Sequence, residues 1–373
     1  MFDVVIVGGG PAGSATGCFL AREGVRVAIV DQAAFPRDKA CGDLLCRVSI
    51  EVLEGMGLSE FLARSTRHTS WPAKQELPNG KVLPFTIRTV VDGERRWTSV
   101  PRRELDAALL AHAQAAGATV IERAKVLDMA VENGGVRLTA AGIQPAALEA
   151  RLAIVAQGST GRFCRRKPDF FAIRGYYAGR PDEKLIIHWM RNLSPGYGWQ
   201  FPLPESGLYN VGLGSTWSLF RQHRLADALP RLAFAGDKQA VGPPRGGALN
   251  TSFGAAPLHD ERTLWVGDAA GLVQPHNGEG ISGALRSGRL AAEVALEALA
   301  SGRMTAGALA TYTRRLHREM GAEFRRARVM AWIIRHPRLF AAVGSFLLSH
   351  FSLTAQEISE ALDRERPSSS ETA

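Results

Sequence analysis

The chain has 373 residues, of which 46% are hydrophobic, and its formal net charge is +9 at pH 7. This length and composition predict a soluble globular protein with two or three packed subdomains. They exclude a membrane-spanning protein, because the longest apolar run, 339–348, is about half of what a span requires.

The first 31 residues have the pattern of a nucleotide-binding βαβ unit. The apolar stretch 2–7 predicts a buried strand, the stretch to Leu20 a helix, and 25–30 a second strand that ends at Asp31. The turn between strand and helix carries a G-x-G-x-x-G fingerprint, and its predicted cofactor contacts are Gly8, Gly10, Ala12 and Gly13. The alternative is an ordinary glycine-rich turn.

Each part of this unit has an expected task. Gly8 permits the tight turn, Gly10 lets the backbone approach a pyrophosphate, and Gly13 lets the helix pack on the strand. The helix N-terminus offers free N–H groups and a positive dipole end to phosphates. Asp31 stands where a carboxylate can accept hydrogen bonds from ribose hydroxyls.

The middle of the chain alternates between helical and strand patterns. Residues 66–100 predict strands and loops, and 102–117 predict a helix with apolar i, i+3, i+4 spacing. Short strands are expected at 119–121, 136–139 and 153–156, and then at 185–190, 199–201 and 208–213. The last three, with their alternating and aromatic patterns, predict a second, antiparallel sheet.

Residues 255–300 return to the nucleotide-binding domain. The apolar strand 264–266 precedes Gly267 and Asp268, and a small-residue helix is expected from about Gly280 to 300. Asp268 can accept from a polyol hydroxyl, and the helix can direct its dipole at the pyrimidine edge of a flavin. The predicted cofactor contacts in this part are Asp268, Gly278, Gly280 and Ile281. The alternative is a strand, turn and helix that serve packing alone.

The predicted fold is α/β, with a Rossmann-type FAD-binding domain, an antiparallel-sheet substrate domain and a C-terminal helical region. The expected divisions are 1–70, 98–165 and 255–300 for the FAD domain, 71–97 and 166–254 for the substrate domain, 301–366 for the helical region, and 367–373 for a disordered tail. Tyr312, Leu316, Met320 and Phe324 are expected on one buried stripe of the helical region.

Charge and cysteine content restrict the partners and the location. Basic residues cluster at 162–167 and at 314–328, but no zinc spacing or recognition-helix pattern supports nucleic-acid binding. Phosphates of cofactor or substrate, or peripheral contact with an anionic membrane, explain the charge as well, and a solvated helix face is the plainest interpretation at 314–328. The four cysteines form no C-x-x-C pair, which is typical of a cytoplasmic protein. We expect no signal peptide, since cleavage would remove the first strand.

Three further segments make the family resemblance specific. Residues 35–43 (FPRDKACGD) resemble the F-P-R-x-K-x-C-G segment of the geranylgeranyl reductase family of FAD-dependent oxidoreductases, within the p-hydroxybenzoate hydroxylase-like superfamily. Residues 195–202 (PGYGWQFP) resemble its P-x-x-Y-x-W-x-F-P motif, and 275–281 (PHNGEGI) its P-x-x-G-E-G-I pattern. Arg102 and Asp106 match its R-x-x-x-D helix start, so the resemblance spans nearly the whole chain.

This resemblance implies FAD as the cofactor, with Cys41, Gly42, Arg102 and the backbone near Val126 among its contacts. It implies a pocket for an apolar small-molecule substrate and reduction of isoprenoid C=C bonds by hydride from reduced FAD. The alternative is monooxygenation, that is, hydroxylation or epoxidation of an aromatic or apolar metabolite. Another alternative, from a different class, is an FAD-binding interaction protein without catalysis. Halogenation is not expected, because the W-x-W-x-I-P motif is absent.

The electron donor is a separate question. Gln157 stands where hydroxylase relatives carry the acid of an Asp-Gly pair, and no second dinucleotide fingerprint is present. We therefore expect NAD(P)H to bind weakly, or a reductase or reduced ferredoxin to supply electrons.

Four residues are candidates for catalysis. Tyr197 and Trp199 alternate with Phe201, so on a strand they share one face, which either lines an apolar pocket or packs against a helix. Cys41 is a candidate proton donor or steric gate, with a small buried hydrophobe as the alternative. His276 could supply a proton at physiological pH, although a loop histidine is more often structural.

Overall fold

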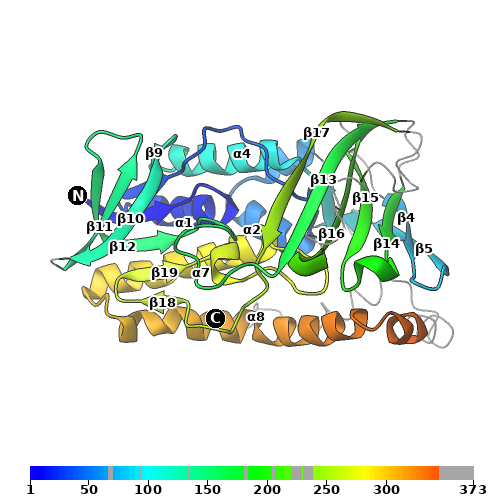
Figure 1. Cartoon of the computed structure of the whole chain (residues 1–373). Helices are drawn as coiled ribbons and strands as arrows, with labels where there is room; N and C mark the ends of the chain where they lie inside the picture. The colour runs from blue at the N-terminus through cyan, green and yellow to red at the C-terminus, as the bar shows by residue number, and fades with distance from the viewer. Residues whose placement is uncertain are drawn as a thin grey trace.

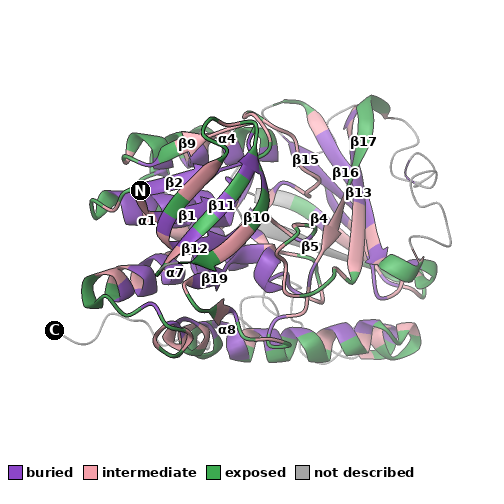
Figure 2. Cartoon of the chain, turned by 60° about the vertical axis from the view of Figure 1, so that its left-hand side comes forward, coloured by how far each residue is buried: buried purple, intermediate pink, exposed green. Residues whose placement is uncertain are grey.

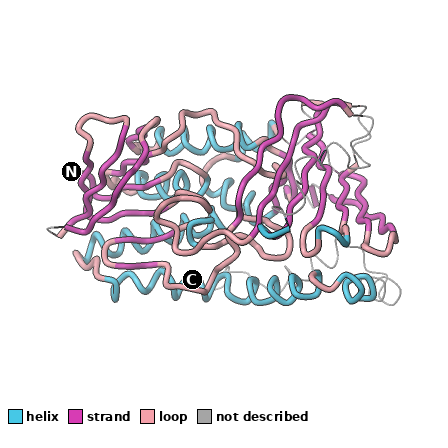
Figure 3. The backbone as a smooth tube through the Cα atoms, in the orientation of Figure 1, coloured by secondary structure: helices cyan, strands magenta, loops and turns pink. Residues whose placement is uncertain are grey.

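The structure is a computed structural model and describes residues 1–65, 70–88, 90–91, 94–132, 134–179, 184–203, 206–219, 229 and 238–343. Its strands gather in two regions, and helices lie alongside both (Figures 1 and 3). The predicted tail 367–373, and the predicted helical region beyond residue 343, lie outside the described residues.

The first sheet is the expected Rossmann-type sheet. Its strands, in spatial order, are β10 (Lys125–Glu132), β11 (Gly135–Ala141), β12 (Ala147–Val155), β1 (Phe2–Val7), β2 (Val27–Val30) and β9 (Thr119–Ile121). Strand β19 (Thr263–Trp265) also pairs with β12, and β18 (His259–Asp260) pairs with β19. The pairs of β1 with β12 and β2, of β2 with β9 and of β12 with β19 are parallel, whereas β10 and β11 form an antiparallel extension.

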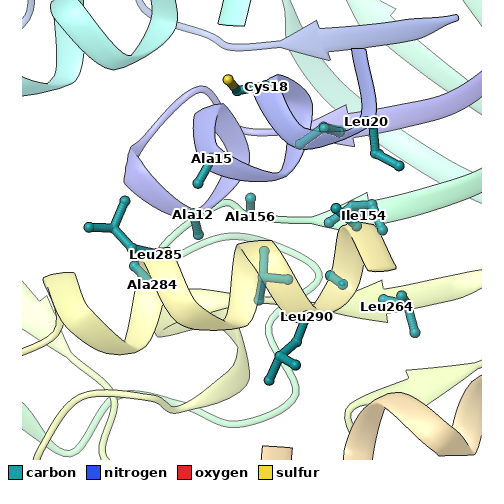
Figure 4. Close-up of a cluster of buried hydrophobic side chains, with 14 of the residues drawn as sticks. Ala12, Ala15, Cys18, Leu20, Ile154, Ala156, Leu264, Ala284, Leu285 and Leu290 are labelled. Carbon is teal, nitrogen blue, oxygen red and sulfur yellow. The ribbon is translucent and has the colours of Figure 1, made fainter. Parts of the chain in front are cut away.

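Helices cover this sheet where the sequence predicted them. They are α1 (Pro11–Arg22), α4 (Arg102–Ala115), α7 (Ile281–Ser301) and α8 (Ala306–Ile334). Small side chains such as Ala12, Ala15 and Ala284 let α1 and α7 approach closely. They belong to a cluster of buried hydrophobic side chains that also includes Leu285 and Ile154 (Figure 4). Close packing of these faces removes apolar surface from water, which is the main source of stability for the domain.

The long helix α8 runs beneath both strand regions (Figure 1). The predicted stripe is confirmed, because Tyr312, Leu316, Met320 and Phe324 are all buried on its inner face. The Tyr312 hydroxyl also donates a hydrogen bond of 2.7 Å to the carbonyl of Trp265, which ties α8 to the nucleotide-binding sheet.

The second sheet has seven strands. Their spatial order is β17 (Gln239–Leu249), β13 (Phe170–Ala178), β16 (Leu208–Thr216), β15 (Tyr197–Leu203), β14 (Leu185–His188), β4 (Ser70–Glu76) and β5 (Val82–Arg88). All pairs are antiparallel except β14 with β4, which run parallel. Strands β15 and β16 are largely buried and β13 is half-buried, whereas β17 is an exposed edge (Figure 2).

Shorter elements connect the two sheets. They are β3 (Leu44–Cys46), α2 (Arg47–Gly55), α3 (Ser59–Arg64), β6 (Val90–Val91), β7 (Glu94–Arg95), β8 (Trp97–Ser99), the 3-10 turn η1 (Arg191–Leu193) and the 3-10 turn η4 (Gly267–Ala270). The pairing of β3 with β8 links the segment after the nucleotide-binding unit to the start of α4. Within the described residues, no helix is long and apolar enough to cross a membrane, and no cluster of side chains has a metal-binding arrangement.

Candidate functional site

One pocket lies between the two sheets and brings most of the predicted site residues together. It holds about 1120 Å³ of space between atoms, including the open solvent at its mouth. Ten of the predicted residues line it: Cys41, Gly42, Arg102, Tyr197, Trp199, Asp268, His276, Gly278, Gly280 and Ile281. Segments that are distant in the chain therefore converge on a single cavity.

The glycine turn borders this pocket through Pro11, whereas the predicted contacts Gly8, Gly10, Ala12, Gly13 and Asp31 are not among the residues that line it. Val126 does not line the pocket. It lies on β10 and is buried in a separate apolar cluster on the β10–β11 side of the sheet.

The space around the turn distinguishes two of its glycines. A Cβ on Gly13 would lie 1.9 Å from the carbonyl oxygen of Gly8, so this glycine is required for the packing of α1. A Cβ on Gly10 would meet only the Arg37 guanidinium, at 3.4 Å, and its backbone angles suit any residue. Gly10 is therefore not required by the fold, and the open space before it fits a dinucleotide pyrophosphate. Helix α1 has no side-chain cap, so its first N–H groups face that space.

Asp31 has a structural task in addition to its predicted one. The Gly9 N–H donates to its Oδ2 at 2.7 Å, and the Ala33 N–H donates to its Oδ1 at 2.8 Å. The carboxylate thus fixes the turn against the end of β2. Each oxygen retains a second lone pair for a ribose hydroxyl.

Asp43 is the centre of a buried network that the sequence did not reveal. Its Oδ2 accepts from the Tyr176 hydroxyl and the Asn210 amide, both at 2.7 Å, and its Oδ1 accepts from the Arg102 N–H at 3.1 Å. Asn210 also donates to the carbonyl of Cys41 at 2.6 Å and accepts from the Trp199 indole at 2.9 Å. This network joins the Cys41–Gly42 loop to β13 and β16 and fixes its position in the pocket.

The pH dependence of stability tests this network. Burial raises the pKa of Asp43 to about 6, whereas an unfolded aspartate titrates near ~4. Between these values the folded state holds a proton that the unfolded state has lost. The free energy of unfolding therefore falls as pH rises through this window, by about 3 kcal/mol at most.

We expect Asp43→Asn to remove this part of the pH slope, because an amide does not titrate. It should also lower stability at neutral pH by about 1–3 kcal/mol, since its N–H₂ group meets donors. Urea unfolding of both proteins across the window measures the effect, and equal slopes would assign the titration to another group.

Cys41 lies against a buried ion-pair cluster. The Arg102 guanidinium makes a bidentate pair with Asp106, at 2.7 and 2.8 Å, and Arg37 joins Asp106 at 3.0 Å. Burial raises the pKa of the Cys41 thiol, against the lowering effect of the Arg102 charge, so the thiol keeps its proton at neutral pH. A protonated thiol beside a fixed cation can donate a proton in the pocket.

The aromatic face of β15 forms one wall. Tyr197, Trp199 and Phe201 all line the pocket, as expected for alternate residues of a strand. Trp199 and Phe201 are nearly parallel, with ring centroids 6.2 Å apart, and Phe201 packs directly on the backbone of Gly42. The Tyr197 hydroxyl donates to the carbonyl of Asn277, so it is already engaged within the wall.

The loop before α7 contributes two pocket residues that each carry a buried, unpaired polar atom within the described part of the chain. Gln274 and His276 both line the pocket, and the Gln274 Oε1 and His276 Nδ1 atoms are buried without a hydrogen-bond partner among the described residues. Orphaned buried polar atoms are costly unless a ligand or water satisfies them. Burial lowers the pKa of His276 to about 4, so its charged form is scarce at neutral pH, which weakens its case as a proton donor.

Hydrogen bonds and an ion pair also fix both ends of this loop. Gln274 donates to Glu323, whose other oxygen pairs with Arg286 at 2.8 Å. Glu279 accepts from the Ser282 N–H at 2.7 Å, so one N–H at the start of α7 is already taken by a carboxylate. From the sequence we expect the positive end of the α7 helix dipole to act on the flavin. The Glu279 carboxylate at this helix end partly offsets that positive charge.

Asp268 lies on η4, beside the start of α7, where a Cβ on Gly280 would come within 3.2 Å of its Oδ1. Its Oδ2 accepts from the Ser159 hydroxyl at 3.1 Å and lies 3.8 Å from the Lys39 ammonium. Lys39 and Gln274 line the pocket but were not predicted as site residues. Lys39 lies within the F-P-R-x-K-x-C-G segment, which could have indicated it, whereas no sequence pattern pointed to Gln274. Gln157 is not among the residues that line the pocket, and its Oε1 accepts from the Phe163 N–H at 3.3 Å.

The chain is similar in sequence and fold to known flavoproteins and reductases. The FAD binding domain family matches residues 1–168. A menaquinone reductase from Mycolicibacterium smegmatis is 34% identical over 92% of this chain and 87% of its own. A digeranylgeranylglycerophospholipid reductase from Methanopyrus kandleri is 31% identical over 88% of this chain and 90% of its own. A solved geranylgeranyl bacteriochlorophyll reductase-like protein from Thermoplasma acidophilum has the same fold, with a TM-score of 0.81, 22% identity and coverage of 98% and 97% of the two chains.

Proposed function

Because the chain belongs to the geranylgeranyl reductase family of FAD-dependent oxidoreductases, we propose that it reduces C=C bonds in the isoprenoid chain of an apolar substrate. One observation carries this proposal. The glycine turn that suits FAD and the aromatic wall of β15 border the same pocket, with Cys41 beside them. Bound FAD would supply the hydride, and the protein supplies binding, orientation and a proton.

The residues that would hold FAD lie at four places. The turn of Gly8, Gly10, Ala12 and Gly13 and the N-terminus of α1 would receive the pyrophosphate, and Asp31 would receive the adenosine ribose. Asp268 would receive the ribityl chain, while Cys41, Gly42, Arg102, Gly278, Gly280 and Ile281 would surround the flavin. The orphaned atoms of Gln274 and His276 would then have possible partners on the cofactor or the substrate.

The substrate class follows from the wall and from the relatives. Tyr197, Trp199 and Phe201 offer an apolar surface of the kind that a polyprenyl chain requires. The two relatives are named for a quinone and for a glycerophospholipid, and the part common to such molecules is the isoprenoid chain. We therefore assign reduction to the chain and not to a quinone ring.

Saturation of a C=C bond requires a hydride and a proton. Of the two candidate acids, the Cys41 thiol is protonated at neutral pH, whereas His276 is then mostly a neutral imidazole. We assign the proton to Cys41. The Asp43 network would hold Cys41 in place during this transfer.

The electron donor gives a separate prediction. Gln157 faces the loop before Phe163, and the chain has no second dinucleotide fingerprint. We expect NADPH and NADH to bleach the flavin slowly and without saturation at micromolar concentrations, and a reductase or reduced ferredoxin to be faster. Anaerobic stopped-flow measurement of the visible flavin band tests this, and rapid, saturable bleaching by NADPH alone would contradict it.

Oxygen use separates reduction from monooxygenation. The reduced holoenzyme is mixed with menaquinone in detergent, once under nitrogen and once in an oxygen-electrode cell. Reduction predicts that menaquinone reoxidises the flavin under nitrogen and does not raise oxygen consumption in air. Substrate-stimulated oxygen consumption, with no reoxidation under nitrogen, would favour the monooxygenase.

A further inference from the structure

Helix α8 has an outer face on which arginine and apolar side chains are exposed together. We define this basic face as Arg314, Arg318, Arg325, Val329 and Trp332, which follow one helical stripe, together with Arg335, Arg338 and Leu339 just beyond the helix end. Val329 is 61% exposed, Trp332 57% and Leu339 38%. Exposed residues alternate with buried ones along the helix, so this stripe lies opposite its packed side (Figure 2).

The face is positive, and its arginines form no ion pair with a carboxylate in the part of the chain that the structure describes. Residues 306–343 contain eight arginines but only two carboxylates, Glu319 and Glu323. Both carboxylates turn towards α7, where Glu319 pairs with Arg286 at 3.0 Å and with Arg289 at 2.9 Å, and Glu323 pairs with Arg286 at 2.8 Å. Their charge is paired with arginines of α7 and does not neutralise the outer stripe.

The end of the face adjoins the wall of the pocket. The Ser194 hydroxyl donates to the carbonyl of Ile334 at 2.7 Å, and Phe340 packs on Trp189 with ring centroids 5.1 Å apart. Trp189 in turn contacts Tyr197, at 4.9 Å between centroids, and Tyr197 lines the pocket. Three aromatic side chains in series therefore connect this end of the face with the wall of the pocket.

We propose that the basic face docks on an anionic lipid bilayer, the source from which the pocket receives its lipid substrate. The inference rests on the proposed isoprenoid substrate, since such molecules reside in membranes. Arginines gain from the negative surface potential of a bilayer, while Trp332, Val329 and Leu339 enter its interfacial region. A nucleic acid would match the charge but would leave the two aliphatic side chains in water.

Vesicle sedimentation of the FAD-loaded protein tests this docking directly. The probes are phosphatidylcholine vesicles with and without phosphatidylglycerol, at low and high salt. We expect binding to the anionic vesicles alone, weakened by salt. Arg325→Gln combined with Arg335→Gln should weaken it on the order of 20-fold. Trp332→Ala should weaken it at both salt concentrations, because that contribution is not electrostatic.

A matched control removes the same charge elsewhere. Arg103 on α4 and Arg137 on β11 are exposed and lie away from α8, so Arg103→Gln combined with Arg137→Gln should bind vesicles as the wild type does. Equal binding to neutral and anionic vesicles, an equal loss in the control, or tighter binding to duplex DNA than to anionic vesicles would overturn the proposal.

The proposed activity is assayed separately. Turnover of menaquinone in detergent needs no bilayer, so the double variant should keep it while losing vesicle binding. An enzyme that binds vesicles through this face but reduces no isoprenoid chain would refute the proposed function and leave the docking surface in place.

Discussion

We expect the Gly10→Val variant to fold normally and to be purified without FAD. The backbone of Gly10 adopts angles open to any residue, and a Cβ there meets only the flexible Arg37 side chain. A branched side chain would instead occupy the space assigned to the pyrophosphate. Overlap of this kind costs about 3 kcal/mol or more, which raises the Kd for FAD at least about 100-fold.

The measurement is the ratio of flavin to protein absorbance after gel filtration, together with the unfolding temperature of the flavin-free protein. Gly307→Val is a suitable control, because a Cβ on Gly307 has no neighbour within 4 Å. A Gly10→Val protein that keeps one FAD per chain would mean that the cofactor does not pass this turn.

The second large effect is expected from Cys41→Ala. This change removes the thiol that we assign as proton donor and leaves the Arg102–Asp106 pair intact. Loss of a general acid typically costs 10²–10⁴-fold in rate, and we expect a fall on the order of 10³-fold in turnover with FAD retained. The turnover of Cys41→Ser should lie between those of the wild type and Cys41→Ala, because a hydroxyl in the same place is a weaker acid than a thiol.

Single-turnover reoxidation of the reduced flavin by menaquinone measures this step without a contribution from product release. Cys46→Ala serves as the control, since Cys46 lies at the end of β3 and does not line the pocket. Turnover by Cys41→Ala within a factor of ~10 of the wild type would place the proton on another group or on water.

Local patterns were sufficient for the nucleotide-binding half of the fold. The run of β1, α1 and β2 is specified by apolar stretches of the right length around a glycine turn, so each element was visible without its neighbours. Helices α2 and α3 were missed, because they are short and lie outside the βαβ unit, where no motif marks them. The parallel pairing of β14 with β4 was missed as well, since it joins strands more than 100 residues apart in sequence.

The site residues also divide into those that local sequence patterns reveal and those that only the fold brings together. Residues within family motifs, such as Cys41 and Trp199, were found from the sequence and do line the pocket. Asp43 was named only as part of a motif, because its partners Tyr176 and Asn210 come from distant strands that only the fold brings near. His276 looked suitable as an acid at physiological pH, but burial, which a sequence does not display, lowers its pKa to about 4.

The product of a single turnover under nitrogen tests the central claim most directly. The holoenzyme is reduced chemically, mixed with menaquinone in detergent, and its extract is exposed to air so that any quinol returns to quinone before mass spectrometry. The account predicts menaquinone that has gained two hydrogens per turnover, with fragmentation placing both in the isoprenoid chain. Menaquinone of unchanged mass after the flavin has been reoxidised would show that only the ring was reduced, and would contradict the account.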